Sequence, residues 1–382
     1  MTSLPHSSDV VIVGGGVMGA SAAFHLAESG VSVVLLERDS LASGSTSKAA
    51  GGVRASFTDP LNIALGARSL ALLRDFPTRP GQDIDLHESG YLYVLTREEH
   101  VDQFRDAMRW HAEFGVPTEL VDADTACRLS PLLDPSEVIA ALWSPRDGHC
   151  TPESVVLGYA RGARMHGAVV STGVEVTGVV MDGRAITSVQ TSAGEVATNC
   201  VIDCAGVWAP SIALLVGLDL PVVPVRRELL ITEPMHVPLE MAFTIDFATS
   251  LYWHREGPGL LTGFSDHRVV PGWSLDRDPT FPARLAELAA SRAPRILDLG
   301  VRSGWAGYYE VTPDHNALIG EWSGASRFLY ATGFSGHGFM LGPAVGEVLR
   351  DLVLGVQPGI DVSALRVDRF AEGVLRPEHA II

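Results

Sequence analysis

The sequence predicts an α/β fold of two domains, one with a parallel sheet assembled from separate parts of the chain and one with a mixed sheet. A chain of 382 residues is longer than a single compact core usually supports. Strand, glycine turn and helix follow one another near both ends, over residues 9–30 and 328–352. We therefore expect a discontinuous first domain (residues 1–86, 148–220 and 310–382) and a second domain (residues 87–147 and 221–309).

The composition is that of a globular, turn-rich chain with an acidic surface. Apolar residues make up 46% and charged residues 19% of the sequence, which also holds 39 glycines. The count of Lys and Arg minus that of Asp and Glu is 28 − 45 = −17. This charge repels phosphate backbones and anionic bilayers, so we expect no nucleic-acid partner. An anionic small molecule would need local cations near its site.

The cysteines and the first apolar segment indicate the cellular compartment in which the chain resides. Cys127, Cys150, Cys200 and Cys204 form neither a CxxC pair nor a regular framework, which is typical of reduced thiols in the cytoplasm. The run Val10–Val13 is too short to span a bilayer and lacks the flanks of a signal peptide. We expect a cytoplasmic chain without a membrane span. No HxxxH or CxxC spacing occurs, so we expect no metal site.

The first element is a buried strand that leads into a glycine turn. Residues 9–13 are mostly β-branched and apolar, and GGGVMG follows at residues 14–19. Glycines at these spacings permit a tight turn, close approach of the backbone to a diphosphate, and packing of the next helix. That helix ends at Gly30, and a second strand, residues 31–36, ends in Glu37, which can accept hydrogen bonds from a ribose. This order predicts a Rossmann-like dinucleotide site and leaves FAD and NAD open.

The next segment is a loop, residues 43–54, rich in Ser, Thr and Gly. Two cations, Lys48 and Arg54, lie among its glycines. The segment is either a flexible surface loop or a ligand loop whose glycines let the backbone approach a cofactor closely. We favour the ligand loop, because a loop after the ribose-binding strand can reach back over a long, extended cofactor.

A second strand, glycine turn and helix occur near the other end. Residues 328–332 are typical of a buried strand, residues 333–340 read GFSGHGFM, and apolar residues follow at helical spacing. The N-terminus of that helix can stabilise negative charge on a reduced cofactor, and plain helix–sheet packing is the alternative.

The second domain is predicted from strand and helix patterns between these units. Residues 90–95 and 251–254 have strand composition, and residues 101–114 have helical spacing. We expect a mixed sheet with helices over one face.

Six short motifs together resemble, in order, the D-amino-acid-oxidase superfamily of flavoproteins. Within it they are most similar to the sarcosine oxidase β subunits and the dye-linked L-proline dehydrogenase β subunits, and the resemblance covers nearly the whole chain. The motifs are Gly14–Gly19, Gly44–Arg54, Asp147-Gly148 with Pro152, Cys204–Trp208, Trp305–Tyr309 with Thr312–Asp314, and Gly333–Met340.

The resemblance implies that the dinucleotide is FAD, held without a covalent bond. It implies contacts to pyrophosphate and ribose from Gly14, Gly16, Gly19, Glu37 and Arg38, and contacts around the ring from Ser45, Thr46 and Gly52. Val176 would lie near the adenine, although its segment also reads as ordinary sheet. The remaining cofactor candidates are Lys48, Cys204, Ala205, Gly206, Trp208, Gly336, His337, Gly338, Phe339 and Met340.

Three positions depart from the monomeric sarcosine oxidases of this superfamily. Gly307 stands where those enzymes carry the cysteine that tethers flavin, so no thioether can form. Leu261 stands where they carry a lysine that activates oxygen, and Met340 stands where a second lysine helps to hold the substrate carboxylate. Slow reaction with oxygen follows, which favours a dehydrogenase over an oxidase.

An amino-acid substrate presents a carboxylate, an amine and a C–H bond, and each needs a partner. Arg54 can pair with the carboxylate through two parallel hydrogen bonds, unless it is a solvated loop arginine. Tyr309 and Tyr252 can line the pocket or belong to the core. His337 can relay a proton or bond backbone, and His254 is a weaker catalytic candidate. Lys48 lies either near N1 and O2 of the flavin or exposed on the loop.

The sequence thus predicts an FAD-dependent oxidoreductase that oxidises an amino acid or small secondary amine, of proline or sarcosine type, by hydride transfer to flavin N5. The alternatives are an oxidase that makes peroxide, a 2-hydroxy-acid dehydrogenase, and a non-catalytic flavoprotein subunit. Expected partners are the substrate, an electron acceptor (a dye, a quinone, a partner subunit or oxygen), and an α subunit or further copies of the chain.

Overall fold

A computed structural model describes residues 4–237 and 239–380. Its first sheet has six strands in the order β18-β19-β12-β1-β2-β8, all parallel except β18. Their bounds are β1 (Val10–Val13), β2 (Val33–Glu37), β8 (Val169–Thr172), β12 (Val201–Asp203), β18 (Leu318–Glu321) and β19 (Phe328–Thr332).

Alternate residues of the central strand β1 enter two different cores. Val10 and Ile12 pack with one layer of helices, whereas Val11 and Val13 pack with a small antiparallel sheet on the other face. The helices are α1 (Val17–Glu28), α2 (Pro60–Arg74), α5 (Pro152–Met165) and α8 (Gly338–Leu354). The small sheet is β9 (Val176–Asp182), β10 (Ala185–Thr191) and β11 (Gly194–Ala197), with α6 (Ala209–Ala213) beside it.

The second sheet is the mixed sheet that the sequence predicts. Its eight strands run β17-β13-β16-β15-β14-β4-β6-β5, and β14 pairs parallel with β4 while the other pairs are antiparallel. The bounds are β4 (Tyr91–Leu95), β5 (Glu119–Val121), β6 (Ala140–Ser144), β13 (Val223–Thr232), β14 (Phe243–Asp246), β15 (Tyr252–Glu256), β16 (Gly259–Gly263) and β17 (Val301–Val311).

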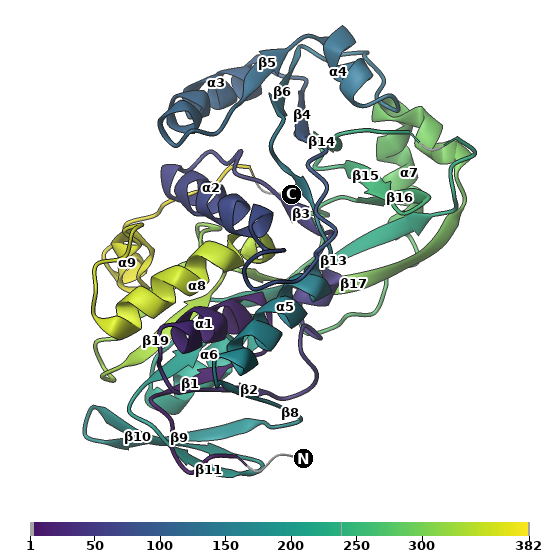
Figure 1. The fold of residues 1–382 in the computed structure, drawn as a ribbon. Helices are drawn as coiled ribbons and strands as arrows, with labels where there is room; N and C mark the ends of the chain where they lie inside the picture. The colour runs from purple at the N-terminus through teal and green to yellow at the C-terminus, as the bar shows by residue number, and fades with distance from the viewer. Residues whose placement is uncertain (1–3, 238, 381–382) are drawn as a thin grey trace.

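Helices α3 (Glu98–Glu113), α4 (Ala123–Leu129) and α7 (Phe281–Arg292) accompany this sheet. In Figure 1 the second sheet and these helices occupy the upper part, and the first sheet with β9–β11 occupies the lower part. A short ribbon of β3 (Gly52–Val53) and β7 (Gly148–His149) lies between them, and α9 (Asp368–Ala371) follows α8. Within the described ranges no helix is both long and apolar enough to cross a membrane.

The register of the first sheet places the carboxyl ends of its parallel strands side by side. Val13 pairs with Leu36 and with Asp203, and Asp203 pairs with Tyr330. The turns that follow β1, β2, β12 and β19 therefore emerge at the same edge, which is where ligands bind in open α/β sheets.

Candidate active site

The glycine turn after β1 is shaped by backbone contacts that leave no room for side chains. Gly14 has φ +109°, and a Cβ atom there would lie 2.4 Å from the carbonyl oxygen of Cys204. A Cβ on Gly19 would lie 1.9 Å from the carbonyl oxygen of Gly14, so the third glycine lets α1 pack against the turn. Gly19 itself does not line the cavity described next.

A cavity of about 590 Å³ runs along this edge and under the second sheet. Residues from both ends of the chain line it, including every candidate cofactor residue except Gly19. They are Gly14, Gly16, Glu37, Arg38, Ser45, Thr46, Lys48, Gly52, Val176, Cys204, Ala205, Gly206, Trp208, Gly336, His337, Gly338, Phe339 and Met340.

The nucleotide end of the cavity has the donors and acceptors that a dinucleotide needs. The Glu37 carboxylate accepts hydrogen bonds from the amides of Gly15 and Asp39, both at 2.7 Å, and still lines the cavity. Thr46 Oγ1 accepts from the amide of Val17 at 3.2 Å, while other amides of the first turn of α1 have no intrahelical acceptor. These groups fit a ribose and a pyrophosphate.

Lys48, the single lysine of the sequence, lines the cavity. A Cβ on Gly307 would lie 2.5 Å from the Cβ of Lys48, so the lysine occupies the space over that glycine. Trp305 Nε1 donates to the Lys48 carbonyl at 3.1 Å and fixes this part of the loop. The loop at residues 43–54 is therefore packed between both sheets.

The second glycine turn brings α8 end-on to the cavity. Gly336 has φ +101°, and a Cβ there would lie 2.4 Å from Cε2 of Tyr309, so the tyrosine ring rests on the glycine. His337 is the N-cap residue of α8 and lines the cavity. The positive end of the α8 dipole therefore faces the cavity.

Arg54 is a buried cation in this cavity. Its exposed fraction is 0%, and its guanidinium lies 4.0 Å from the ring centre of Phe57. Nη1 donates to the Ser56 carbonyl at 3.1 Å and Nη2 to the Ala380 carbonyl at 2.6 Å. Nε has no partner, and no carboxylate among the described residues pairs with Arg54. The charge of Arg54 acts on the buried Asp147 without forming an ion pair, so an anionic ligand could supply the direct partner of the guanidinium.

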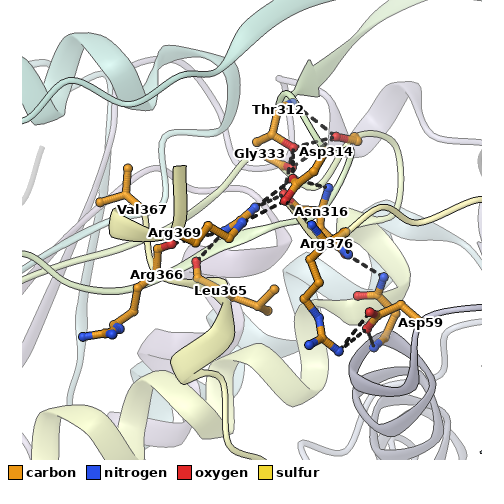
Figure 2. A network of polar contacts seen from close by, with 12 residues as sticks. Asp59, Thr312, Asp314, Asn316, Gly333, Leu365, Arg366, Val367, Arg369 and Arg376 are labelled. Atoms are coloured by element: carbon orange, nitrogen blue, oxygen red, sulfur yellow. Dashed lines mark hydrogen bonds and ion pairs between the residues drawn. The ribbon is translucent and has the colours of Figure 1, made fainter. Parts of the chain in front are cut away.

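The contact between Arg54 and Ala380 depends on an anchored segment, residues 376–380. Figure 2 shows Arg376 reaching Asp59, the N-cap residue of α2, and Asp314 held by Arg369. The Arg376–Asp59 distance is 2.9 Å, and Arg369 meets Asp314 through two bonds of 2.9 Å.

Glu378 anchors the same segment from within. Its carboxylate accepts hydrogen bonds from the amides of Thr58, Asp59 and Ala380 at 3.1, 3.1 and 2.8 Å. The Thr58 hydroxyl and Asn62 Nδ2 also donate to it, at 2.5 and 3.0 Å. Burial opposes its ionisation, but these hydrogen-bond donors lower the pKa of Glu378 below its usual range.

The two tyrosines predicted from sequence both line the cavity. Burial raises the pKa of Tyr309 and of Tyr252, so both hydroxyls stay protonated at working pH and can donate to a carboxylate or amine. Tyr252 also packs in the core of the second sheet.

The two histidines differ in position. His337 lies edge-on to Phe57 at 5.2 Å, and burial together with the charge of Arg54 lowers its pKa to about 3. It therefore stays a neutral imidazole at working pH. His254 does not line the cavity. It stacks on Phe243 at 4.5 Å and contacts His149, and burial lowers its pKa to about 3.

The cavity is also lined by five charged residues that sequence reasoning missed: Asp39, Glu175, Arg227, Glu228 and Glu310. Arg227 on β13 lies over the Tyr309 ring at 5.2 Å, and Glu310 at the end of β17 faces the turn before α8. Burial raises the pKa of Glu310 to about 7. The sequence signal was the charged triplet Arg226-Arg227-Glu228 inside an otherwise apolar strand. Leu261 lies in the core of the second sheet, 2% exposed, and outside the cavity lining.

A dinucleotide cradle on one sheet, closed by Arg54 and by Arg227, Tyr252 and Tyr309 of a second sheet, defines a two-domain dinucleotide-dependent oxidoreductase. Comparison with known proteins names the family. A model of the FAD dependent oxidoreductase family, DAO, matches residues 9–352, so the chain belongs to that family. This confirms the family and the fold class expected from the sequence motifs.

Individual relatives agree with that assignment. Mitochondrial dimethylglycine dehydrogenase of Mus musculus is 29% identical over 96% of this chain, and mitochondrial sarcosine dehydrogenase of Homo sapiens is 28% identical over 96%. The chain spans 44% and 42% of those proteins, less than half of each. The crystal structure of L-proline dehydrogenase from P. horikoshii superimposes with a TM-score of 0.93 at 31% identity, covering 98% of this chain and all of that one.

Proposed function

We propose that the protein is an FAD-dependent dehydrogenase that oxidises the CH–NH bond of an amino acid or small secondary amine of proline or sarcosine type. The buried guanidinium of Arg54 carries this proposal. It lines the same cavity as the turn before α8 and pairs with no carboxylate in the described part of the chain. A substrate carboxylate supplies that missing anion.

The residues of the chain position and desolvate the substrate. Arg54 takes the carboxylate, with its guanidinium fixed by the Ala380 and Ser56 carbonyls. Tyr309 and Tyr252 present neutral hydroxyls to the same space, and His337 stays uncharged, so the pocket favours the neutral amine over the ammonium form. FAD, held by the glycine turn, Glu37 and the loop at residues 43–54, would supply the hydride acceptor, its N5 atom.

Two features support a non-covalent cofactor and an acceptor other than oxygen. Gly307 offers no nucleophile, and Lys48 fills the space over it. Leu261, where the monomeric sarcosine oxidases carry their oxygen-activating lysine, is uncharged and packs in the core of the second sheet outside the cavity lining. We propose a dye, a quinone or a partner subunit as the acceptor, a cytoplasmic location, and assembly with an α subunit or with further copies of the chain.

Anaerobic mixing of the FAD-loaded protein with secondary and primary amino acids tests the proposal. Loss of the flavin absorbance with amines and not with 2-hydroxy acids is the expected result. Peroxide formation in air at the rate of turnover would instead indicate an oxidase. Flavin that no amine reduces would indicate a non-catalytic subunit. Acid precipitation should release all the flavin into the supernatant.

A further inference from the structure

A second cation, the half-buried Arg227, shares the cavity with Arg54. Arg227 comes from β13, lines the cavity, and makes one hydrogen bond among the described residues, from Nη1 to the carbonyl of its neighbour Arg226 at 3.1 Å. Its Nε is buried without a partner. Burial lowers the pKa of Arg227, which reflects the cost of holding this charge away from water.

The carboxylates near Arg227 are already bound to other arginines. Glu228 pairs with Arg226 at 3.3 Å, and Asp266 pairs with Arg268 at 3.2 Å and with Arg284. No ion pair of Arg227 occurs within residues 4–237 and 239–380. The Tyr309 ring under its guanidinium supplies a cation–π contact, which compensates only part of the desolvation of a full charge.

The two unpaired cations enter the cavity from different parts of the fold, since Arg54 follows β3 and Arg227 lies on β13. Arg54 stacks near Tyr93 of β4, whereas Arg227 belongs to β13, which is four strands away in the sheet. The charges of both guanidinium groups act on the pKa of Tyr309, so both groups lie near this tyrosine in the cavity. One carboxylate satisfies one of them and leaves the other without an anion.

We propose that Arg227 forms a second anion subsite, and that the substrate is an amino acid with two carboxylates. One carboxylate, beside the carbon that loses hydride, binds Arg54. The second, on the side chain or on the nitrogen substituent, binds Arg227. This proposal rests on the proposed function of the cavity and narrows its substrate class. The subsite also gives a chain of net charge −17 the local positive field that an anionic substrate requires.

The test compares each dicarboxylic amino acid with its own amide in anaerobic flavin reduction. Glutamate and glutamine, aspartate and asparagine in both enantiomers, and iminodiacetate and its monoamide are matched in shape and differ in one charge. If Arg227 pairs with the second carboxylate, the flavin reduction rate divided by the substrate Kd should be about 10- to 100-fold higher for each acid than for its amide. Equal rates for acid and amide would overturn the proposal while leaving amine oxidation intact.

Variants locate the effect. Arg227→Met should abolish the preference for acid over amide, and Arg227→Lys should keep part of it because the charge remains. The matched control is Arg302→Met, which removes one exposed arginine from β17 outside the cavity and should keep the full preference. If Arg227→Met slowed flavin reduction by acids and by amides by the same factor, the proposal would be wrong. Arg227 would then bind the carboxylate that acids and amides share, or hold Tyr309 in place.

A binding measurement is independent of turnover. Glutarate and its monoamide should both perturb the oxidised flavin spectrum of the wild-type holoprotein, with glutarate bound about 10- to 100-fold more tightly. If no amine reduced the flavin but glutarate still bound more tightly than its monoamide, the proposed function would be refuted and the anion subsite would be supported. Equal affinity for glutarate and its amide would refute the subsite.

Discussion

Glu310 makes a quantitative prediction about stability and pH. The side chain faces the cavity, and its carboxylate accepts from the Thr332 hydroxyl at 3.3 Å and the Phe334 amide at 3.4 Å. Burial outweighs these weak bonds and raises its pKa from 4.5 to about 7. Nearby Asp203 is also buried, and burial raises its pKa well above the usual range, with the charge of Glu310 adding to the effect.

The magnitude follows from linkage. The folded state binds the Glu310 proton more tightly than the unfolded state, so its contribution to stability is complete below pH 4.5 and disappears as the pH rises to 7. A difference of 7 − 4.5 = 2.5 pKa units corresponds to about 3 kcal/mol, which water in the open cavity reduces to about 2 kcal/mol. Glu310→Gln removes this dependence and stabilises the protein at pH 8.

Urea unfolding of the FAD-free protein, followed from pH 5 to pH 8, measures the effect. The wild-type free energy of unfolding should fall by about 2 kcal/mol more than that of Glu310→Gln across this range. Glu372→Gln, a change at an exposed glutamate after α9, is the control and should follow the wild type. If the free energy of unfolding changed with pH in the same way for wild type and Glu310→Gln, the reasoning would be refuted. Ionisation of Glu310 would then not destabilise the folded state.

Three further predictions concern the cradle, the anchored segment and the lysine. Gly19→Ala places a methyl group against the Gly14 carbonyl, so the variant should lose bound FAD and about 3 kcal/mol of stability. The control Gly359→Ala adds its methyl group in open space and should lose neither. Retention of FAD by Gly19→Ala would contradict this prediction. Glu378→Ala leaves four N–H donors without their acceptor, so the free energy of unfolding, measured by thermal unfolding, should fall by about 3 to 5 kcal/mol. A fall of less than about 1 kcal/mol would contradict the anchoring role of Glu378. An amine-reactive label should modify Lys48 in apoprotein and spare it in holoprotein, as peptide mapping can measure; equal labelling would place Lys48 outside the cofactor site.

The parts of the fold that depend on neighbouring residues were predictable from the sequence. The buried strand β1, the turn with Gly14 and the second strand ending in Glu37 are contiguous, so their spacing specifies their shape. The same holds for β19 and the turn into α8. The helix expected at residues 101–114 begins earlier, at Glu98, because Glu98 and Glu99 suit the positive first turn of a helix.

What only the tertiary structure decided is which distant side chains share the cavity. Arg227 reaches Tyr309 because β13 pairs with β17 in antiparallel register, and Arg54 meets Ala380 across 326 residues of chain. No local pattern encodes such pairings, since a charged residue in a strand can face solvent or a pocket with the same sequence around it. The sequence by itself therefore determined the nucleotide cradle, the family and the candidates Arg54 and Tyr309 at the substrate end. Long-range strand pairing decided that Arg227 and Glu310 join them in one cavity.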